Sequence, residues 1–258
     1  MTTIECKEVC MSFGDQIVLD HISMRFENGH IYGITGRNGS GKTVLLKLIC
    51  GLMTPTSGMI LMNGKPVGAS GTMHAEIGAL IERPGFLGQY SGYKNLYLLA
   101  KLRNKIGKME IVQTMQTVGL DPTLKKRVAS YSLGMKQRLG IAQAVMENPD
   151  ILILDEPLNA IDSDGVNRIR KLILAQKQAG KLIIVCSHIQ SDIDHLADQV
   201  VHLQEGKLHE VHASCPVVPH SAGGMATAVT IPLRTSFAIF FNANVSITTS
   251  LPVCVTML

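Results

Sequence analysis

The sequence contains no tryptophan, and aromatic residues make up only 4% of it. Proteins that bind single-stranded nucleic acids stack bases on aromatic side chains, and proteins that bind duplexes need clustered basic residues. The formal net charge is only +4, and no long basic run occurs. We therefore expect no nucleic-acid partner.

Long apolar runs are also missing. No stretch of about 18 consecutive apolar residues occurs, so no segment is suited to crossing a bilayer as a helix. The N-terminal sequence MTTIECKEV carries charges and no apolar core, which predicts no secretory signal. With 46% hydrophobic residues over 258 positions, the chain can bury the core of one large α/β domain. We expect a cytoplasmic protein.

No cysteine pair has the C-x-x-C spacing of redox and zinc motifs. The six cysteines lie at positions 6, 10, 50, 186, 215 and 254, and scattered thiols of this kind are typical of reduced, intracellular proteins. Cys6 and Cys10 are four apart on an expected strand, which predicts that both point to one face. Metal binding by this pair is disfavoured because two further ligands at matching spacing are missing.

In the first quarter of the chain, the pattern predicts strands, a glycine-rich loop and a helix. Segment 17–26 has strand-like content, and Asn28-Gly29 supplies a turn before a short buried strand at 31–35. The glycine-rich stretch 36–41 follows at once, and then an apolar helical run at 43–50. This order is the one that gives a parallel α/β sheet its phosphate site.

Further along, helical periodicity over about 87–147 predicts a helical lobe inserted into the α/β core. The apolar runs 151–154 and 182–186 suit strands buried on both faces of a parallel sheet, with a helical segment at 163–178 between them. Segments within 199–211, joined by Glu205-Gly206, predict a closing hairpin. The main domain is therefore expected to span 1–212.

The remaining segment, 213–258, has a different composition. Arg234 is its one charged residue, far below the 17% of the whole chain. An edge-strand extension, a partner-contacting tail and translation from a shifted reading frame are all compatible with it. No motif chooses among these, so the tail receives no function.

A phosphate-binding motif follows the strand at 31–35. The sequence fits G-x-x-x-x-G-K-[ST] at every fixed position. Glycines allow a ring of backbone N–H groups to surround a triphosphate, and the helix that follows directs its positive end at the anion. Lys42 would reach the β- and γ-phosphates, and Thr43 would offer its hydroxyl to Mg²⁺. The motif consists of Gly36, Arg37, Asn38, Gly39, Ser40, Gly41, Lys42 and Thr43.

An acidic motif ends the apolar run at 151–154. Asp155 and Glu156 come directly after it, at the carboxyl edge of the expected sheet, where ligands of open α/β folds bind. Asp155 is expected to hold Mg²⁺ directly or through water, and Glu156 to polarise the water that attacks the γ-phosphate. His188 follows the run at 182–186 and could hydrogen-bond the γ-phosphate, although a lone histidine more often has a surface or core role.

Over about residues 3–211 the chain resembles the nucleotide-binding domains of ABC transporters. The deciding segment is YSLGMKQR at 131–138, which is similar to the family's signature motif, usually LSGGQ followed by a basic segment. The resemblance implies an α/β P-loop NTPase core with a parallel sheet, an N-terminal antiparallel β subdomain and an inserted helical lobe. It also implies that Ser132 and Gly134 contact the γ-phosphate held by a second copy, in a head-to-tail ATPase dimer or pseudo-symmetric pair with membrane permease subunits.

Other family positions map in order. Phe13 matches an aromatic residue that stacks on adenine, Asp162 matches a loop that links the two sites, and His188 matches the switch histidine. The lobe at 87–147 matches the part that receives the permease. ATP and Mg²⁺ are the implied ligands, and the implied location is the inner face of the cell membrane.

Two departures narrow the resemblance. Glu82 stands where the family usually has glutamine, which puts a carboxylate near Mg²⁺ and the γ-phosphate and adds it to the expected catalytic and metal-binding set. The signature also reads SLGM in place of SGGQ. Together with the run IGALIERPGF, both features resemble the subfamily that exports peptide antibiotics, including bacitracin-resistance and lantibiotic-protection systems. Other small exporters remain open.

Three non-transport readings compete. An ABC-type translation factor normally carries two cassettes in one chain, and this chain has one. A DNA-repair or chromosome-maintenance ATPase separates its two motifs by a long coiled coil or inserts zinc-binding cysteines, and neither occurs here. A non-catalytic regulator would be expected to lose Lys42 or Glu156, and both are present.

Overall fold

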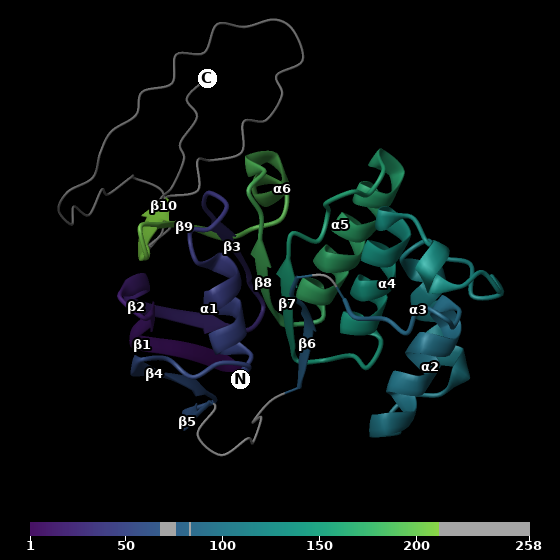
Figure 1. Ribbon diagram of the computed structural model, residues 1–258, viewed down its shortest axis with the longest axis horizontal. Helices are drawn as coiled ribbons and strands as arrows, with labels where there is room; N and C mark the ends of the chain where they lie inside the picture. The colour runs from purple at the N-terminus through teal and green to yellow at the C-terminus, as the bar shows by residue number, and fades with distance from the viewer. Residues whose placement is uncertain (68–75, 83, 212–258) are drawn as a thin grey trace, which may run out of the picture. The chain divides into compact units, whose positions relative to one another are not determined.

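The computed structural model describes residues 1–67, 76–82 and 84–211, which belong to one compact unit, Met1–Ala213. The tail at 213–258 lies outside the described residues. Two sheets organise this unit (Figure 1). The predicted α/β fold with a parallel sheet and an N-terminal antiparallel subdomain is confirmed.

The N-terminal sheet is antiparallel and has the strand order β2-β1-β4-β5. Buried and exposed residues alternate along its strands because one face packs on the core. Asn63-Gly64 forms the turn between the last two strands, with positive φ at both residues. The strands are β1 (Thr3–Phe13), β2 (Gln16–Glu27), β4 (Ser57–Met62) and β5 (Lys65–Pro66).

A bulge in β1 changes which face its cysteines occupy. The ladder to β2 shifts register between Cys6 and Val9, and Glu8 has a φ of 49°. The extra residue reverses the alternation, so Cys6 is buried in the core while Cys10 lies on the opposite face and is half-buried. The prediction that both thiols share a face is therefore wrong.

The second sheet carries the strands that end near the glycine-rich loop. Its order is β10-β9-β3-β8-β7-β6, with parallel pairing throughout except for the β9–β10 hairpin. The central strands are buried at every residue, as expected when both faces of a parallel sheet are covered. The strands are β3 (Ile31–Thr35), β6 (Ile77–Leu80), β7 (Ile151–Asp155), β8 (Leu182–Cys186), β9 (Gln199–Gln204) and β10 (Lys207–Val211).

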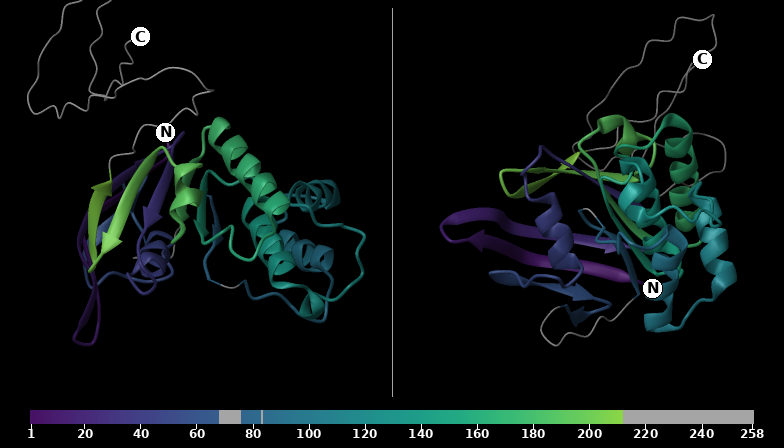
Figure 2. Two further views of the ribbon diagram at one scale, coloured as in Figure 1. Left: turned by 90° about the horizontal axis from the view of Figure 1, so that it is seen from above. Right: turned by 45° about the vertical axis from the view of Figure 1, so that its right-hand side comes forward.

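Helices cover both faces of this sheet. Helix α1 (Lys42–Ile49) lies between it and the antiparallel sheet, whereas α4 (Leu133–Val145), α5 (Ser163–Gln178) and the short α6 (Gln190–Asp194) cover the other face. Helices α2 (Gly92–Arg103) and α3 (Lys108–Thr117) pack beside α4 and extend this helical side (Figure 2).

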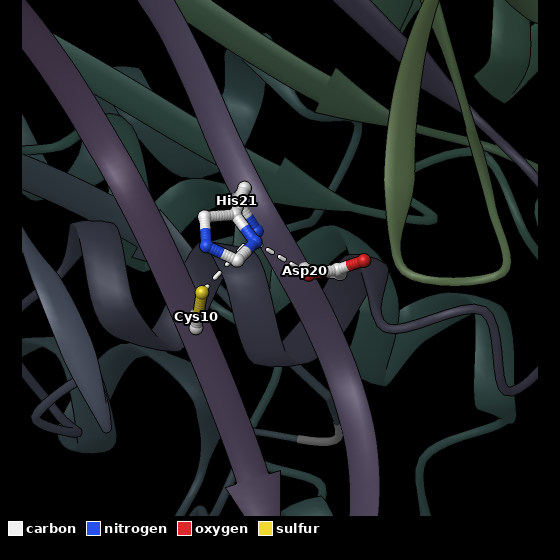
Figure 3. Close-up of side chains that lie close together, drawn as sticks. All are labelled: Cys10, Asp20 and His21. Carbon is white, nitrogen blue, oxygen red and sulfur yellow. Dashed lines mark hydrogen bonds and ion pairs between the residues drawn. The ribbon is translucent and has the colours of Figure 1, made fainter.

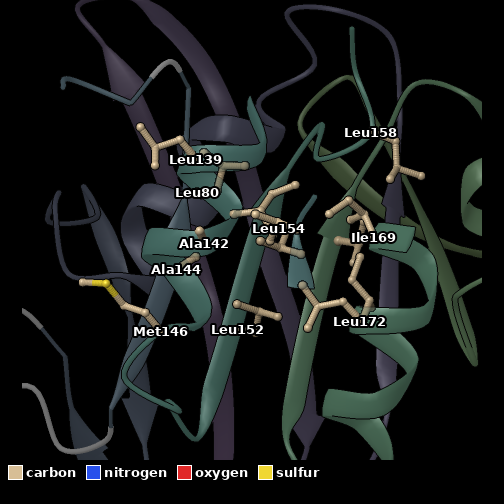
Figure 4. Packing of buried hydrophobic residues seen from close by; sticks show 14 of the residues in the cluster. Leu80, Leu139, Ala142, Ala144, Met146, Leu152, Leu154, Leu158, Ile169 and Leu172 are labelled. Carbon is tan, nitrogen blue, oxygen red and sulfur yellow. The ribbon is translucent and has the colours of Figure 1, made fainter. Parts of the chain in front are cut away.

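Alternation along β7 divides the hydrophobic core in two. Ile151 and Ile153 pack toward α1, while Leu152 and Leu154 pack toward the helices on the other face (Figure 4). The strand that ends in Asp155 is thus fixed from both sides, which holds its carboxyl end in place for function. None of the helices in the described ranges combines the length and apolar character needed to span a bilayer.

Candidate functional site

Three neighbouring parallel strands deliver the predicted motifs to one edge of the sheet. The glycine-rich loop follows β3, Asp155 ends β7, and His188 lies just beyond β8. The strands are in register at this edge, where Cys186 of β8 lies beside Ile34 on one side and beside Asp155 on the other. Segments far apart in the sequence therefore converge where open α/β sheets bind their ligands.

The loop from Gly36 ends in the N-terminus of α1, which has no side-chain cap. Gly41 occupies the capping position with a φ of 101°, and a Cβ there would lie 3.1 Å from the Val18 carbonyl oxygen. Only glycine suits this combination of left-handed backbone and close packing. Because no side chain in the described ranges caps α1, the N–H groups of its first turn are available to an anion.

Two buried polar groups at the glycine-rich loop, the Lys42 ammonium and the Ser40 hydroxyl, are placed to bind an anion. Lys42 is only 6% exposed, and its ammonium group donates to the carbonyl oxygens of Gly36 (2.7 Å) and Arg37 (3.1 Å). The buried Ser40 Oγ has no hydrogen-bond partner among the described residues. A buried cation and an unsatisfied hydroxyl in a loop of backbone donors fit a phosphate group.

A cavity of about 370 Å³ opens over this loop. Val18 was missed by the sequence analysis because no local motif marks it; its place follows from the packing of β2 against Gly41. The cavity is lined by Val18, Asn38, Gly39, Ser40, Gly41, Lys42, Thr43, Val44, Asp155 and Glu156.

Thr43 and Asp155 form the part of the site suited to a divalent cation. Thr43 Oγ1 donates a 2.7 Å hydrogen bond to Asp155 Oδ2. Burial raises the pKa of Asp155, and the charges of Glu156 and Glu82 act in the same direction, against the Thr43 hydrogen bond and the Lys42 charge. The Thr43 hydroxyl and the Asp155 carboxylate are oxygen ligands of the kind that Mg²⁺ binds. A bound Mg²⁺ would offset the negative charge of the carboxylates around Asp155.

Glu156 and His188 are joined directly. The Glu156 carboxylate accepts a hydrogen bond from the backbone N–H of His188 (3.0 Å). The same carboxylate oxygen lies 2.8 Å from Nδ1 of the His188 ring. Glu156 has a φ of 50°, and Gln137 of α4 donates to its carbonyl oxygen at 2.9 Å. Sequence analysis did not single out Gln137. These contacts hold the carboxylate at the rim of the cavity.

Glu82 has different surroundings. It has a φ of 58°, its side chain is 59% exposed, and it forms a 2.5 Å ion pair with Lys47 of α1. It is not among the residues that line the cavity, although its charge contributes to the raised pKa of Asp155. Phe13, the expected adenine-stacking residue, is half-exposed at the end of β1 and is likewise outside the lining set.

The signature segment lies apart from the lining of this cavity. Ser132 caps α4 by accepting from the Met135 N–H at 3.2 Å. A Cβ on Gly134 would come within 2.5 Å of the Ala160 carbonyl oxygen, so the helix packs on the 160–162 loop through this glycine. Arg138 pairs with Asp162 and ties the same two elements together. Gly134 and Arg138 thus join α4 to the loop that carries Asp162, and none of the predicted residues Ser132, Gly134 and Asp162 lines the cavity over the phosphate loop.

Comparison with known proteins agrees with this geometry. The family model described as ABC transporter matches residues 19–159. The bacitracin transport ATP-binding protein BcrA of Enterococcus faecalis is 39% identical and covers 80% of this chain and 68% of its own. The lantibiotic transport ATP-binding protein SrtF of Streptococcus pyogenes is 36% identical and covers 76% of this chain and 85% of its own.

Among solved structures, the dimeric bacterial ABC transporter cassette MJ0796 has the same fold. Its TM-score is 0.74 at 21% identity, and the match covers 82% of this chain and 99% of that one. The family match, residues 19–159, spans the phosphate loop and the acidic strand. The chain belongs to the ABC transporter family, as an ABC ATPase subunit of a transporter.

Proposed function

We propose that this ATPase binds Mg²⁺-ATP over the glycine-rich loop and powers export of a peptide antibiotic through a separate membrane permease. The observation that carries the catalytic part is the convergence of Lys42, Thr43, Asp155 and Glu156 on one cavity. The substrate class rests on the relatives, whose names specify bacitracin and lantibiotic transport.

The phosphate end of the nucleotide fits the groups around the loop. Backbone N–H groups and the N-terminus of α1 would hold the phosphate oxygens, with Lys42 leaving its two carbonyl partners to contact them. Thr43 and Asp155 would hold Mg²⁺, which supplies charge neutralisation at the β- and γ-phosphates. The adenine would extend toward Val18 and the half-exposed Phe13.

Glu156 is the group placed to act on water. Its carboxylate is at the cavity rim and is oriented by His188, so it can accept a proton from, or polarise, a water aimed at the γ-phosphate. His188 would then hold both that carboxylate and the γ-phosphate. Glu82, paired with Lys47 outside the lining, would act on coupling and on the charge of Asp155 rather than on phosphate binding.

Ser132 and Gly134 give the reason to propose a dimer. The N-terminal, positive end of α4 begins at the Ser132 cap on the surface of the chain. It lies outside the lining of the nucleotide cavity of the same chain. A second copy arranged head to tail would bring this helix end to the γ-phosphate. Asp162, tied to α4 through Arg138, would then communicate between the two sites.

A pull-down with the native membrane fraction tests the transport assignment. The tagged chain, extracted in mild detergent, should bring down a small polytopic membrane protein and sit peripherally on the inner membrane face. ATP hydrolysis by that complex should rise with bacitracin or a lantibiotic and stay flat with an unrelated amphiphile. Recovery with ribosomes or DNA would overturn the assignment, and stimulation only by unrelated compounds would overturn the substrate class alone.

A further inference from the structure

A bulge in the β1–β2 ladder brings three potential metal ligands together on the antiparallel sheet (Figure 3). The register shifts so that Cys10 of β1 lies opposite both Asp20 and His21 of β2, and His21 has a φ of 50°. An extra residue in a strand re-aims its side chains. Cys10 comes from β1, and the fold brings two further candidate ligands to it from β2.

The three side chains are already close enough for a shared ion. His21 Nδ1 lies 2.6 Å from Asp20 Oδ1, and the His21 backbone N–H donates to Cys10 Sγ at 3.3 Å. One ligand atom from each residue lies within 4.8 Å of the others. Bonds of about 2.0–2.3 Å in a tetrahedral site place ligand atoms roughly 3.3–3.8 Å apart, so small side-chain rotations suffice.

The ligand types select the class of ion. Asp20 supplies a carboxylate, whose oxygens pair with His21 at 2.6 Å and with Lys207 at 3.3 Å. Thiolate and imidazole ligands favour Zn²⁺ and similar transition metals over Mg²⁺ and Ca²⁺, which prefer oxygen. A cavity of about 430 Å³ borders Asp20 and His21 and leaves room for a water as the fourth ligand.

Lys207 of β10 competes for the same carboxylate. Its ammonium group lies 3.3 Å from Asp20 Oδ2, and its side chain is 61% exposed. A surface lysine of this kind holds its partner weakly and can swing into solvent. The competition makes a directional prediction: removing the positive charge of Lys207 should strengthen metal binding.

We propose that Cys10, Asp20 and His21 form a binding site for one Zn²⁺-class transition-metal ion, with water completing its coordination. The site is built from β1 and β2 and shares no residue with the lining of the nucleotide cavity. Asp20 is two residues from Val18 of that lining, so the ion would brace the strand on which the nucleotide cavity closes.

The test uses the full chain, tag-free and stripped of metal, titrated with Co²⁺ in the presence of excess Mg²⁺. We expect one Co²⁺ per chain, a thiolate-to-cobalt charge-transfer band, and displacement of Co²⁺ by Zn²⁺. Cys10→Ser should abolish the band, and His21→Ala should weaken binding roughly tenfold or more, because each removes one of three ligands. Lys207→Met should tighten binding several-fold.

Two matched variants separate this site from adventitious binding. His209→Ala removes an exposed histidine from β10, and the double variant Cys215→Ser/Cys254→Ser removes the two thiols outside the described residues. Both should leave the band and the affinity unchanged. A band that survives Cys10→Ser, an affinity unaffected by His21→Ala, or weaker binding in Lys207→Met would each overturn the proposal. Circular dichroism of every variant shows whether its fold is retained.

Discussion

The phosphate loop and the signature helix differ in how their functional groups are satisfied. At the start of α1, Lys42 is buried against two carbonyl oxygens of the loop and Thr43 is bonded to Asp155, so these groups are held by partners from the loop and from β7. At the start of α4, the capping bond is the one hydrogen bond that the Ser132 hydroxyl makes with the described part of the chain, and Leu133 beside it is 56% exposed. One region is assembled within the chain and the other faces outward.

This difference supports our proposal that a single chain holds half of a catalytic site. The cavity lining contains the loop and the acidic strand but no residue of the 131–138 segment. Gly134 and Arg138 instead bind the signature helix to the 160–162 loop, which follows Glu156 in the chain. A partner's γ-phosphate arriving at Ser132 would therefore be connected through Asp162 to the carboxylate of the other site.

Replacing Glu156 by glutamine should have the largest effect. Glutamine keeps an acceptor for the His188 N–H but cannot take a proton, so we expect turnover to fall about 10²–10⁴-fold with ATP binding retained. Phosphate release and nucleotide binding measure this, and gel filtration should show an ATP-dependent dimer. Glu5→Gln, on β1, is the control. A variant that binds ATP yet stays monomeric would break the half-site comparison, and unchanged hydrolysis would remove Glu156 from catalysis.

Mixing two inactive variants sharpens the comparison further. Lys42→Ala disables the loop of its own chain, and Ser132→Arg disables the helix end that we assign to the neighbour's site. In a mixed dimer both defects fall in one site, so an equal mixture should recover roughly a quarter of the wild-type rate, because half the dimers are mixed and each has one intact site. If both residues served the same chain's nucleotide, mixing would recover nothing.

Glu82→Gln should change coupling more than affinity. The Glu82 side chain of the Glu82–Lys47 pair is 59% exposed, and solvent-facing pairs contribute up to about 1 kcal/mol, so we expect the ATP dissociation constant to stay within about fivefold. Permease-stimulated hydrolysis should shift more than basal hydrolysis. Lys47→Met breaks the same pair from the other side and serves as the matched variant. A large loss of ATP affinity in Glu82→Gln alone would place the carboxylate at the phosphates.

Local signals predicted most elements that position the site. Continuous apolar runs identified β7 and β8, and the segment 163–178 coincides with α5. In each case the signal is carried by the residues of the element itself, through burial on both faces or helical period.

What the sequence missed depends on contacts between distant segments. The bulge at Glu8 separates Cys6 from Cys10, and it arises from the pairing of β1 with its neighbours rather than from a Gly or Pro signal. Val18 reaches the cavity because β2 packs on Gly41, and Gln137 reaches Glu156 because α4 lies against the 156–162 loop. Such contacts have no local pattern, so only the folded chain shows them.

Replacing Asp155 by asparagine should have the smallest of the expected effects, a change of a few degrees in the melting temperature. The variant separates stability from function within the assembled half of the site. Burial raises the pKa of Asp155 in the folded chain, so the ionised carboxylate destabilises the nucleotide-free fold. The contribution of Asp155 to the free energy of unfolding is therefore fully present below its unfolded pKa and is lost as pH rises through its folded pKa. The asparagine side chain can still accept from Thr43 and carries no charge. We expect a melting temperature higher by a few degrees, at about 2–4 °C per kcal/mol, and a gain over the wild type that is larger at pH 7 than at pH 4, close to the ordinary pKa of an aspartate.

Mg²⁺-ATP should reverse this order of stability, because the nucleotide and its metal stabilise the wild type through the Asp155 carboxylate and barely affect the Asp155→Asn variant. Thermal melts at both pH values, with and without Mg²⁺-ATP, measure the two effects separately. A nucleotide-free variant that melts below the wild type at pH 7 would show that the Asp155 charge is already compensated by Lys42, and the assembled half of the site would then need no cation to complete it.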